Sequence, residues 1–227
     1  MDYVRNLGDE RQMAFCVHCG GTTETRDHVP SRVLLDEPYP PQLPAVPACR
    51  SCNEALSKDE VYFACLIECA RVGSVNEDAI QREKIRRIIQ ESPALAARLT
   101  QARTETDNGI LFAVEYERVK KVVLKLGRGH AAFELNEPQH DDPDTLSVIP
   151  LHCMQEDDYR YFETPPHSSM WPEVGSRAMQ RLISLNTGAA GWIIVQLGQY
   201  RYLASAGPPV IVRMVLGEYL GCEVVWT

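Results

Sequence analysis

Two stretches of this chain decide how it folds: residues 16–31, CVHCGGTTETRDHVPS, and residues 48–60, ACRSCNEALSKDE. Each stretch contains a CxxC pair, whose tight turn aims both sulfur atoms at one point. Two such pairs supply the four thiolates that a structural zinc ion takes in tetrahedral coordination. The predicted zinc ligands are Cys16, Cys19, Cys49 and Cys52.

The residues around the first pair fit this assignment. Gly20 and Gly21 follow the pair directly and can adopt the positive φ angles that a tight knuckle requires. His18 lies inside the pair and is interpreted as a spacer. The chain has eight cysteines in all. Cys65 and Cys69 recur at helical spacing among apolar residues, so they are predicted to pack in the core as small apolar groups.

Composition is that of an ordinary globular protein. Of the 227 residues, 44% are hydrophobic and 24% are charged, so a packed core is expected. The formal net charge of -8 argues against binding of nucleic acid by bulk electrostatics, although binding depends on where the charges lie. The sequence carries no signal peptide and no apolar run of membrane-spanning length. We therefore expect a cytoplasmic protein with no membrane partner, in which CxxC pairs hold metal rather than form disulfides.

The order of the elements predicts an α+β chain in two parts. Residues 1–75 are expected to form a zinc-stapled module, in which Ser57 caps a helix that ends at Gly73. Residues 76–227 are expected to form a helical region and a C-terminal antiparallel sheet. Further helices are predicted over residues 77–90, 116–129 and 176–185, with Pro93 ending the first or starting another. Strands are predicted over residues 110–115, 147–151 and 210–226, with a hairpin over residues 192–205 around Leu197 and Gly198.

Residues 116–129 give the clearest helical pattern. One apolar stripe is formed by Val119, Val122, Val123 and Leu126. Gly127 and Gly129 are expected to stop this helix. A basic stripe on the same helix is interpreted either as a solvated face or as a phosphate-contacting surface. Its members, all candidate nucleic-acid contacts, are Arg118, Lys121, Lys125 and Arg128.

An Asp-His pair lies between the two CxxC pairs. Asp27 and His28 are adjacent, and neighbours on a strand project to opposite faces, so a shared site needs a bend or a metal to organise both. Taken alone, this dipeptide is compatible with a structural role. Asn53 follows the last predicted zinc ligand at the start of a helix, where taken alone it would be a helix cap.

Together these residues resemble a known enzyme family. The order CxxC, Asp-His-Val-Pro, CxxC and then Asn is similar to the HNH endonucleases, also called ββα-metal or His-Me finger nucleases. It resembles especially the four-cysteine branch that includes phage recombination endonuclease VII. The resemblance covers roughly residues 14–62. It implies a small ββα-metal finger, in which a strand pair and a helix hold one divalent cation.

The resemblance implies a role for each matched residue. His28 would be the general base that activates water, because a neutral imidazole can accept the proton near neutral pH. Asp27 and Asn53 would be ligands of a catalytic Mg²⁺ or Mn²⁺, a hard cation that prefers oxygen ligands. The four cysteines would hold the zinc that fastens strand to helix. We expect this staple to bend the strand so that Asp27 and His28 face one metal-bound phosphate.

Some features depart from the family pattern. Many HNH sequences carry a middle Asn where this chain has Pro44, within a proline-rich loop that we expect to be stiffened by fixed φ angles. A third metal ligand is not matched directly. Glu60, about two turns after Asn53, could approach the metal or could be an acidic residue of the first helical turn. Further candidates for phosphate contacts are Arg26, Arg32 and Lys58.

Three functions follow as alternatives. The first is a metal-dependent endonuclease that hydrolyses nucleic acid, with DNA as the expected substrate and defence against foreign DNA as a fitting role. The second is a non-catalytic zinc module that binds nucleic acid or protein, and the third is a different zinc-organised enzyme. Asp27, His28 and Asn53 favour the first, since a zinc ribbon has no use for all three. Residues 76–227 could position substrate, bind a protein partner or form a homodimer.

Overall fold

A short strand pair followed by a helix forms the N-terminal part of the chain. The computed structural model describes residues 3–4, 12–107, 109–166, 170–185 and 191–227, so residues 1–2 and 5–11 of the expected zinc-stapled module lie outside the described residues. The elements here are β1 (Tyr3–Val4), β2 (Thr25–His28), β3 (Leu43–Ala48), α1 (Arg50–Ala55) and α2 (Ser57–Val72). β2 and β3 pair antiparallel, with Thr25 opposite Ala48 and His28 opposite Ala45. β1 lies parallel to β3 on its other side, and the order β-β-α agrees with the expectation.

The second half of the proline-rich segment differs from its prediction as a loop. Pro44 and Pro47 lie inside β3, between the other two strands of this sheet. Proline lacks an N–H group but keeps its carbonyl, and these carbonyls are used. Pro44 accepts from the Val29 amide at 3.0 Å, and Pro47 accepts from the Val17 amide at 3.0 Å. Residues 43–48 therefore form a strand whose proline carbonyls accept from the residue after β2 and from a residue of the first CxxC pair.

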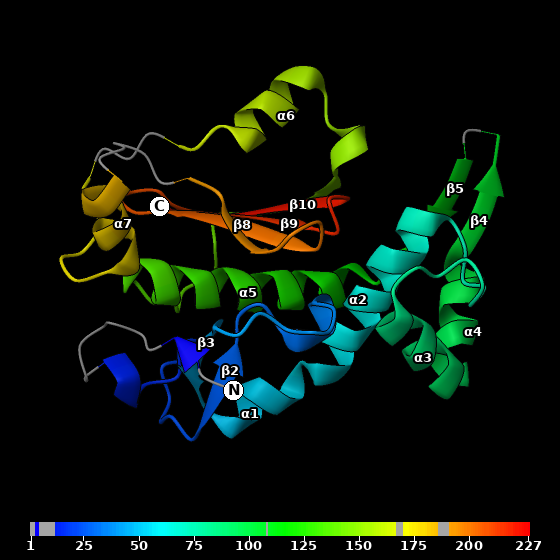
Figure 1. Cartoon of the computed structure of the whole chain (residues 1–227), viewed down its shortest axis with the longest axis horizontal. Helices are drawn as coiled ribbons and strands as arrows, with labels where there is room; N and C mark the ends of the chain where they lie inside the picture. The colour runs from blue at the N-terminus through cyan, green and yellow to red at the C-terminus, as the bar shows by residue number, and fades with distance from the viewer. Residues whose placement is uncertain (1–2, 5–11, 108, 167–169, 186–190) are drawn as a thin grey trace.

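The helix α5 (Tyr116–Leu135) lies between the N-terminal strand pair and the C-terminal sheet (Figure 1). The prediction that Gly127 and Gly129 stop this helix is wrong, because it continues through both and ends at Asn136, whose φ is 60°. A Cβ atom at Gly129 would lie 2.5 Å from Val29 Cγ2, and one at Gly127 would lie 3.1 Å from Val224 Cγ2. The two glycines let α5 approach β2 on one side and the sheet on the other.

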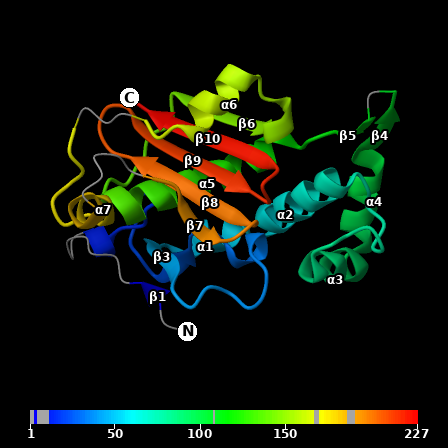
Figure 2. The same ribbon diagram turned by 45° about the horizontal axis from the view of Figure 1, so that its top comes forward.

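The C-terminal region forms a five-stranded antiparallel sheet with the order β6-β10-β9-β8-β7, as expected for this part of the α+β chain. Its strands are β6 (Thr145–Pro150), β7 (Ile193–Gln196), β8 (Tyr200–Ser205), β9 (Val210–Leu216) and β10 (Leu220–Trp226). The predicted hairpin is confirmed, with Gly198 at φ 74° between β7 and β8. Every residue of β9 is buried. Helix α5 packs on this sheet, and α6 (Glu156–Glu163) lies on the opposite side (Figures 1 and 2).

A buried arginine holds α6 to the outer face of the sheet. Arg213, from β9, is fully buried and donates to Glu223 on the neighbouring strand at 2.6 Å. The carbonyls of Tyr161, Phe162 and Thr164, at the end of α6, accept from the same guanidinium at 2.7 to 3.0 Å. A guanidinium can satisfy several acceptors at once, which is the condition for burying its charge.

The remaining helices lie at the edge of the molecule and at one end of the sheet. They are α3 (Glu83–Glu91), α4 (Pro93–Ala102) and α7 (Arg177–Leu185), with the hairpin β4 (Arg103–Thr106) and β5 (Gly109–Phe112). Pro93 begins a helix of its own, and Ser57 is the first residue of α2 rather than its cap. Gly73 ends α2 in the left-handed conformation, as predicted. Among the described residues, no helix combines the length and the apolar character needed to cross a membrane.

One hydrophobic cluster runs through both predicted parts of the chain. It contains Val17 and Val46 from the N-terminal part, Leu126 from α5, and Val212 and Trp226 from the sheet. The division near residue 75 falls just after the end of α2. The division of the chain into two domains there remains a prediction. The two parts share this hydrophobic core.

A buried histidine makes the stability of this core sensitive to acid. His130, on α5, is fully buried, lies 2.8 Å from the Tyr200 hydroxyl and stacks on the Tyr202 ring with centroids 3.7 Å apart. Burial lowers its pKa from an ordinary 6.5 to about 3. Between these pH values the unfolded chain binds one more proton at residue 130 than the folded chain. The folded state therefore loses stability as pH falls below 6.5.

We predict that His130→Phe, which keeps an aromatic ring beside Tyr202, will weaken this dependence. The free energy of unfolding of the native chain should fall by about 1.4 kcal/mol more per pH unit than that of the variant, between pH 6 and about pH 4. Urea unfolding at several pH values measures the two slopes. The exposed His152 provides the control, and His152→Phe should leave the slope of the native chain unchanged. Equal slopes for all three proteins would contradict a neutral buried imidazole.

Candidate metal centre and active site

The four predicted zinc ligands form one cluster. The Sγ atoms of Cys16, Cys19, Cys49 and Cys52 all lie within 4.8 Å of one another, and those of Cys19 and Cys49 are 3.8 Å apart. Tetrahedral zinc with Zn–S bonds of about 2.3 Å sets sulfur-sulfur distances at about 3.8 Å. The donor set and its spacing therefore fit a structural metal ion such as zinc.

Backbone groups shape both knuckles. Gly20 has a φ of 72°, and its amide donates to the Cys16 carbonyl at 2.8 Å, which closes the first turn. Cys49 caps α1, and its sulfur accepts from the Cys52 amide at 3.3 Å. This amide lowers the pKa of Cys49 and so favours the thiolate that a metal requires. Cys65 and Cys69 are buried in α2, where burial raises the pKa of each to about 12, and their predicted role as apolar core groups is confirmed.

His28 is the last residue of β2 and is half-buried. Its Nε2 lies 2.9 Å from a terminal nitrogen of Arg32. Arginine has only donors, so Nε2 must be the accepting nitrogen and the hydrogen of the neutral ring lies on Nδ1. Nδ1 is buried and has no hydrogen-bond partner among the described residues, and the Pro44 carbonyl raises the pKa of the ring.

The electrostatic surroundings favour neutral His28. Burial is the main cause that lowers its pKa from the ordinary 6.5, and the positive charge of Arg32 is the second. The Pro44 carbonyl and the Asp27 carboxylate act in the opposite direction and are weaker. The imidazole is therefore able to accept a proton at neutral pH.

Asp27 points into the interior. It is 4% exposed, and its Oδ2 lies 2.9 Å from His18 Nε2 and 3.0 Å from Lys125 Nζ. Asp27 and His28 therefore project to opposite sides of β2, as strand geometry requires. The expectation that the zinc staple bends β2 until both side chains face one phosphate is not met, because β2 keeps regular pairing with β3 through residue 28.

Asn53 reaches the same strand from α1. Its side-chain amide donates to Thr25 Oγ1 at 3.1 Å and to the Arg26 carbonyl at 3.2 Å, which belongs to the peptide bond leading to Asp27. Thr25 and Asp27 are two residues apart on β2, so they share one face of the strand. Asn53 is therefore a link between helix and strand on the Asp27 face, and its amide oxygen is left for another partner.

The donor set fits a divalent cation only in part. The hydrogen bonds described above use Oδ2 of Asp27 and the amide nitrogen of Asn53, which leaves one hard oxygen on each side chain. Glu60 does not join them. Its Oε1 accepts from the Ser31 hydroxyl at 2.6 Å and from Lys125, whose ammonium stands between the two carboxylates. We therefore correct Glu60 from a candidate metal ligand to a partner of a buried lysine.

The predicted basic stripe on α5 is mostly used inside the protein. Arg118 pairs with Asp59 at 2.5 Å and lies over the Tyr62 ring at 4.3 Å. Arg128 donates to the carbonyls of His18 at 3.1 Å and His140 at 2.8 Å. These contacts hold α5 to α2 and to the first zinc knuckle.

The prediction that Lys125 contacts nucleic acid is wrong, because Lys125 is 4% exposed and cannot belong to a surface. Of the four stripe residues, Lys121 alone is classed as exposed. Arg26, Arg32 and Lys58, from the N-terminal region, are also exposed. Most of the exposed candidate contacts are therefore in the N-terminal region near His28 rather than on α5.

Sequence reasoning missed His18 and Ser31, which complete the buried network around Lys125. His18 was interpreted as a spacer, yet it is 8% exposed and hydrogen-bonds Asp27. A signal for Lys125 was present in the sequence. It stands three residues after Val122, within the apolar side of the helix, where a charged residue needs a buried partner.

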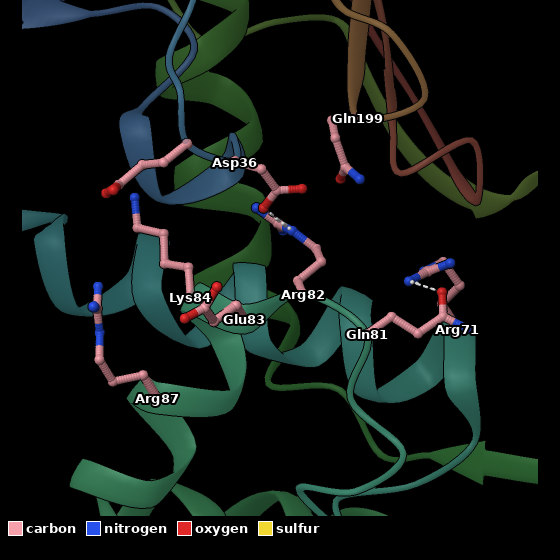
Figure 3. Close-up of a pocket in the computed structure, with 9 residues that line it drawn as sticks. Asp36, Arg71, Gln81, Arg82, Glu83, Lys84, Arg87 and Gln199 are labelled. Carbon is pink, nitrogen blue, oxygen red and sulfur yellow. Dashed lines mark hydrogen bonds and ion pairs between the residues drawn. The ribbon is translucent and has the colours of Figure 1, made fainter.

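A polar cleft of about 320 Å³ lies between α2, α3 and the β7–β8 turn (Figure 3). Several of its charges are already paired, because Arg82 binds Asp36 at 2.8 Å and Arg71 binds Glu68 at 2.8 Å. Lys84 donates to the Arg32 carbonyl at 2.9 Å and so connects the cleft to the segment after His28. The residues that line the cleft are Asp36, Glu37, Arg71, Gln81, Arg82, Glu83, Lys84, Arg87 and Gln199.

Comparison of the chain with protein-family models, curated proteins and solved structures gave no match. The resemblance to HNH endonucleases therefore rests on the residues quoted above.

We predict that Cys49→Ser will release the metal and destabilise the N-terminal part. Three thiolates and a hydroxyl bind zinc less well than four thiolates, and zinc binding is coupled to folding. Metal content by mass spectrometry and thermal unfolding measure the two effects. Cys153 is exposed and outside the cluster, so Cys153→Ser should keep both values of the native chain. Full zinc content in Cys49→Ser would contradict the structural site.

We also predict that Lys125→Met will reduce the free energy of unfolding by about 3–5 kcal/mol, the cost of leaving buried partner charges uncompensated. Methionine has a similar length but cannot bind the carboxylates of Asp27 and Glu60. Lys121 lies one turn earlier on α5 and is exposed, so Lys121→Met should change stability by less than about 0.5 kcal/mol. Urea unfolding compares them, and equal stability of the two variants would refute the buried ion pairs.

Proposed function

We propose that this protein is a metal-dependent endonuclease of the HNH type that hydrolyses phosphodiester bonds of nucleic acid, with DNA as the expected substrate. The observation that carries the proposal is the contact of Asn53, from α1, with β2 beside Asp27 and His28. A strand pair, a following helix and a four-cysteine cluster surround this contact in the order that the family uses. A zinc module without activity needs the cysteines but gains nothing from a neutral, half-buried histidine next to this contact.

Each residue has a task that its surroundings support. Nε2 of His28, the ring nitrogen that carries no hydrogen, would accept the proton of the attacking water. Arg26 and Arg32 would bind phosphate oxygens as bidentate donors. Lys125 and His18 hold the Asp27 carboxylate in one orientation.

The free oxygens of Asp27 and Asn53 are the groups of this chain that would hold a catalytic Mg²⁺ or Mn²⁺. Such a cation, when bound, neutralises charge on the phosphate and the leaving oxygen. Hard oxygen donors favour these cations, whereas the four thiolates favour zinc, so the two metals would be sorted by ligand chemistry.

The non-catalytic zinc module that binds nucleic acid or protein is the second candidate, and one observation favours it. The Lys125 ammonium already lies 3.0 Å from Asp27 Oδ2 and supplies a positive charge where a metal ligand is required. A cation close to this ammonium would be repelled by it. In such a module Asp27 and Asn53 would have structural roles, while exposed Arg26, Arg32 and Lys58 would still bind phosphates.

A cleavage assay separates the two candidates. We expect the native protein with Mg²⁺ or Mn²⁺ to cut plasmid DNA, with RNA as the parallel substrate, and His28→Ala to lower the rate by at least about 100-fold. His152→Ala, which removes an exposed histidine far from β2 in sequence, is the matched control and should cut normally. Cleavage that survives His28→Ala would exclude this general base. Binding of nucleic acid without cleavage under any condition would favour the second candidate.

A further inference from the structure

The contact between Arg32 and His28 covers the atom that the proposed reaction needs. A neutral imidazole has a single lone pair in the ring plane, on the nitrogen without hydrogen. That nitrogen is Nε2, and its lone pair accepts from the Arg32 guanidinium at 2.9 Å. A water molecule cannot donate to the same lone pair while this hydrogen bond is present. The base is therefore capped in the structure as it stands.

The cap can move without disturbing the fold. Arg32 begins a short 3₁₀ helix, Arg32–Leu34, and its carbonyl accepts from the Leu35 amide at 3.1 Å and from Lys84 at 2.9 Å. These bonds fix the backbone of the residue. The side chain is exposed, and its guanidinium carbon lies 5.8 Å from the centre of the Tyr39 ring. Rotation of this exposed side chain would uncover the base.

A phosphodiester is the natural competitor for this guanidinium. Arginine binds phosphate through two parallel, charge-assisted hydrogen bonds, which are roughly twice as strong as bonds to a neutral acceptor. The neutral His28 ring offers one nitrogen and no charge. A phosphate at this surface is therefore a better acceptor for the Arg32 guanidinium than the His28 ring.

We propose that Arg32 is a substrate-operated cap, which covers His28 Nε2 in the free protein and uncovers it when a phosphodiester of the nucleic acid takes the guanidinium. The proposal rests on the nuclease function for its biological meaning, since it assigns the base and the substrate of that same site. It gives Arg32 two tasks, since its guanidinium binds the substrate phosphate and controls access to His28. Water reaches the base only after a phosphate is bound next to it, so recognition and activation are coupled in one side chain.

Carbethoxylation of His28 tests the cap without any cleavage reaction. Diethyl pyrocarbonate acylates an imidazole at a nitrogen lone pair, and the rate at His28 is read from the mass of its peptide. The zinc-loaded full chain is used at pH 8, where an imidazole with an ordinary or lowered pKa is neutral and the rate reports access alone. Arg32→Gln should raise the rate about tenfold, because a charge-assisted hydrogen bond no longer covers Nε2. Arg87→Gln, which removes an exposed arginine of α3 outside the proposed site, should leave it unchanged.

Dimethyl phosphate, the smallest phosphodiester, tests the release. At constant ionic strength it should accelerate modification of the native chain and have no effect on Arg32→Gln, which has no cap to lift. Equal rates for the native chain and Arg32→Gln would show that the contact is not a cap. A native rate that dimethyl phosphate leaves unchanged would show that phosphate does not operate it. Failure of the nuclease function alone would appear as absent plasmid cleavage with both carbethoxylation effects intact.

Discussion

The buried ammonium of Lys125 is the interaction on which the rest of the structure depends. It joins Asp27 of β2 to Glu60 of α2, and it comes from α5, so three separate elements meet at one nitrogen. Each charge is 10% exposed or less, and none could be buried alone without a large desolvation cost. His18 and Ser31 occupy further hydrogen-bonding positions of the two carboxylates. The first zinc knuckle is thereby tied to the same network.

This network requires α5 to lie unusually close to β2. The absence of a side chain at Gly129 allows the approach, since any Cβ there would overlap Val29, the residue directly after His28. Gly127 allows the same helix to contact Val224 in the sheet on its other side. A helix held on both faces fixes the distance between the four-cysteine cluster and the C-terminal sheet. The sheet thus supports the N-terminal site, which explains why one hydrophobic cluster runs through both parts of the chain.

The features predicted correctly from sequence are those whose cause is local. CxxC spacing brought the four cysteines together, and turn residues located the hairpin at Gly198 and the helix end at Gly73. The errors concern residues whose partners are distant in the chain. Two glycines near the end of a helical pattern usually indicate a helix end. Gly127 and Gly129 instead allow close packing against residues about 100 positions earlier and later in the chain. Lys125 looked like part of a solvated stripe, because neither Asp27 nor Glu60 can be recognised as its partner without the fold.

The opposite directions of Asp27 and His28 divide the site between the two faces of β2. The Asp27 face holds Asn53 and the Lys125 network, whereas His28 meets Pro44 and Arg32. A phosphate that uses both faces has to lie at an end of the strand, and His28 is its last residue. Arg32 lies four residues after His28 in the chain, and its backbone carbonyl accepts a hydrogen bond from Lys84. In the proposed function, the end of β2 is consequently where a hard cation held by Asp27 and Asn53, a neutral base and an exposed guanidinium would act on the same phosphodiester.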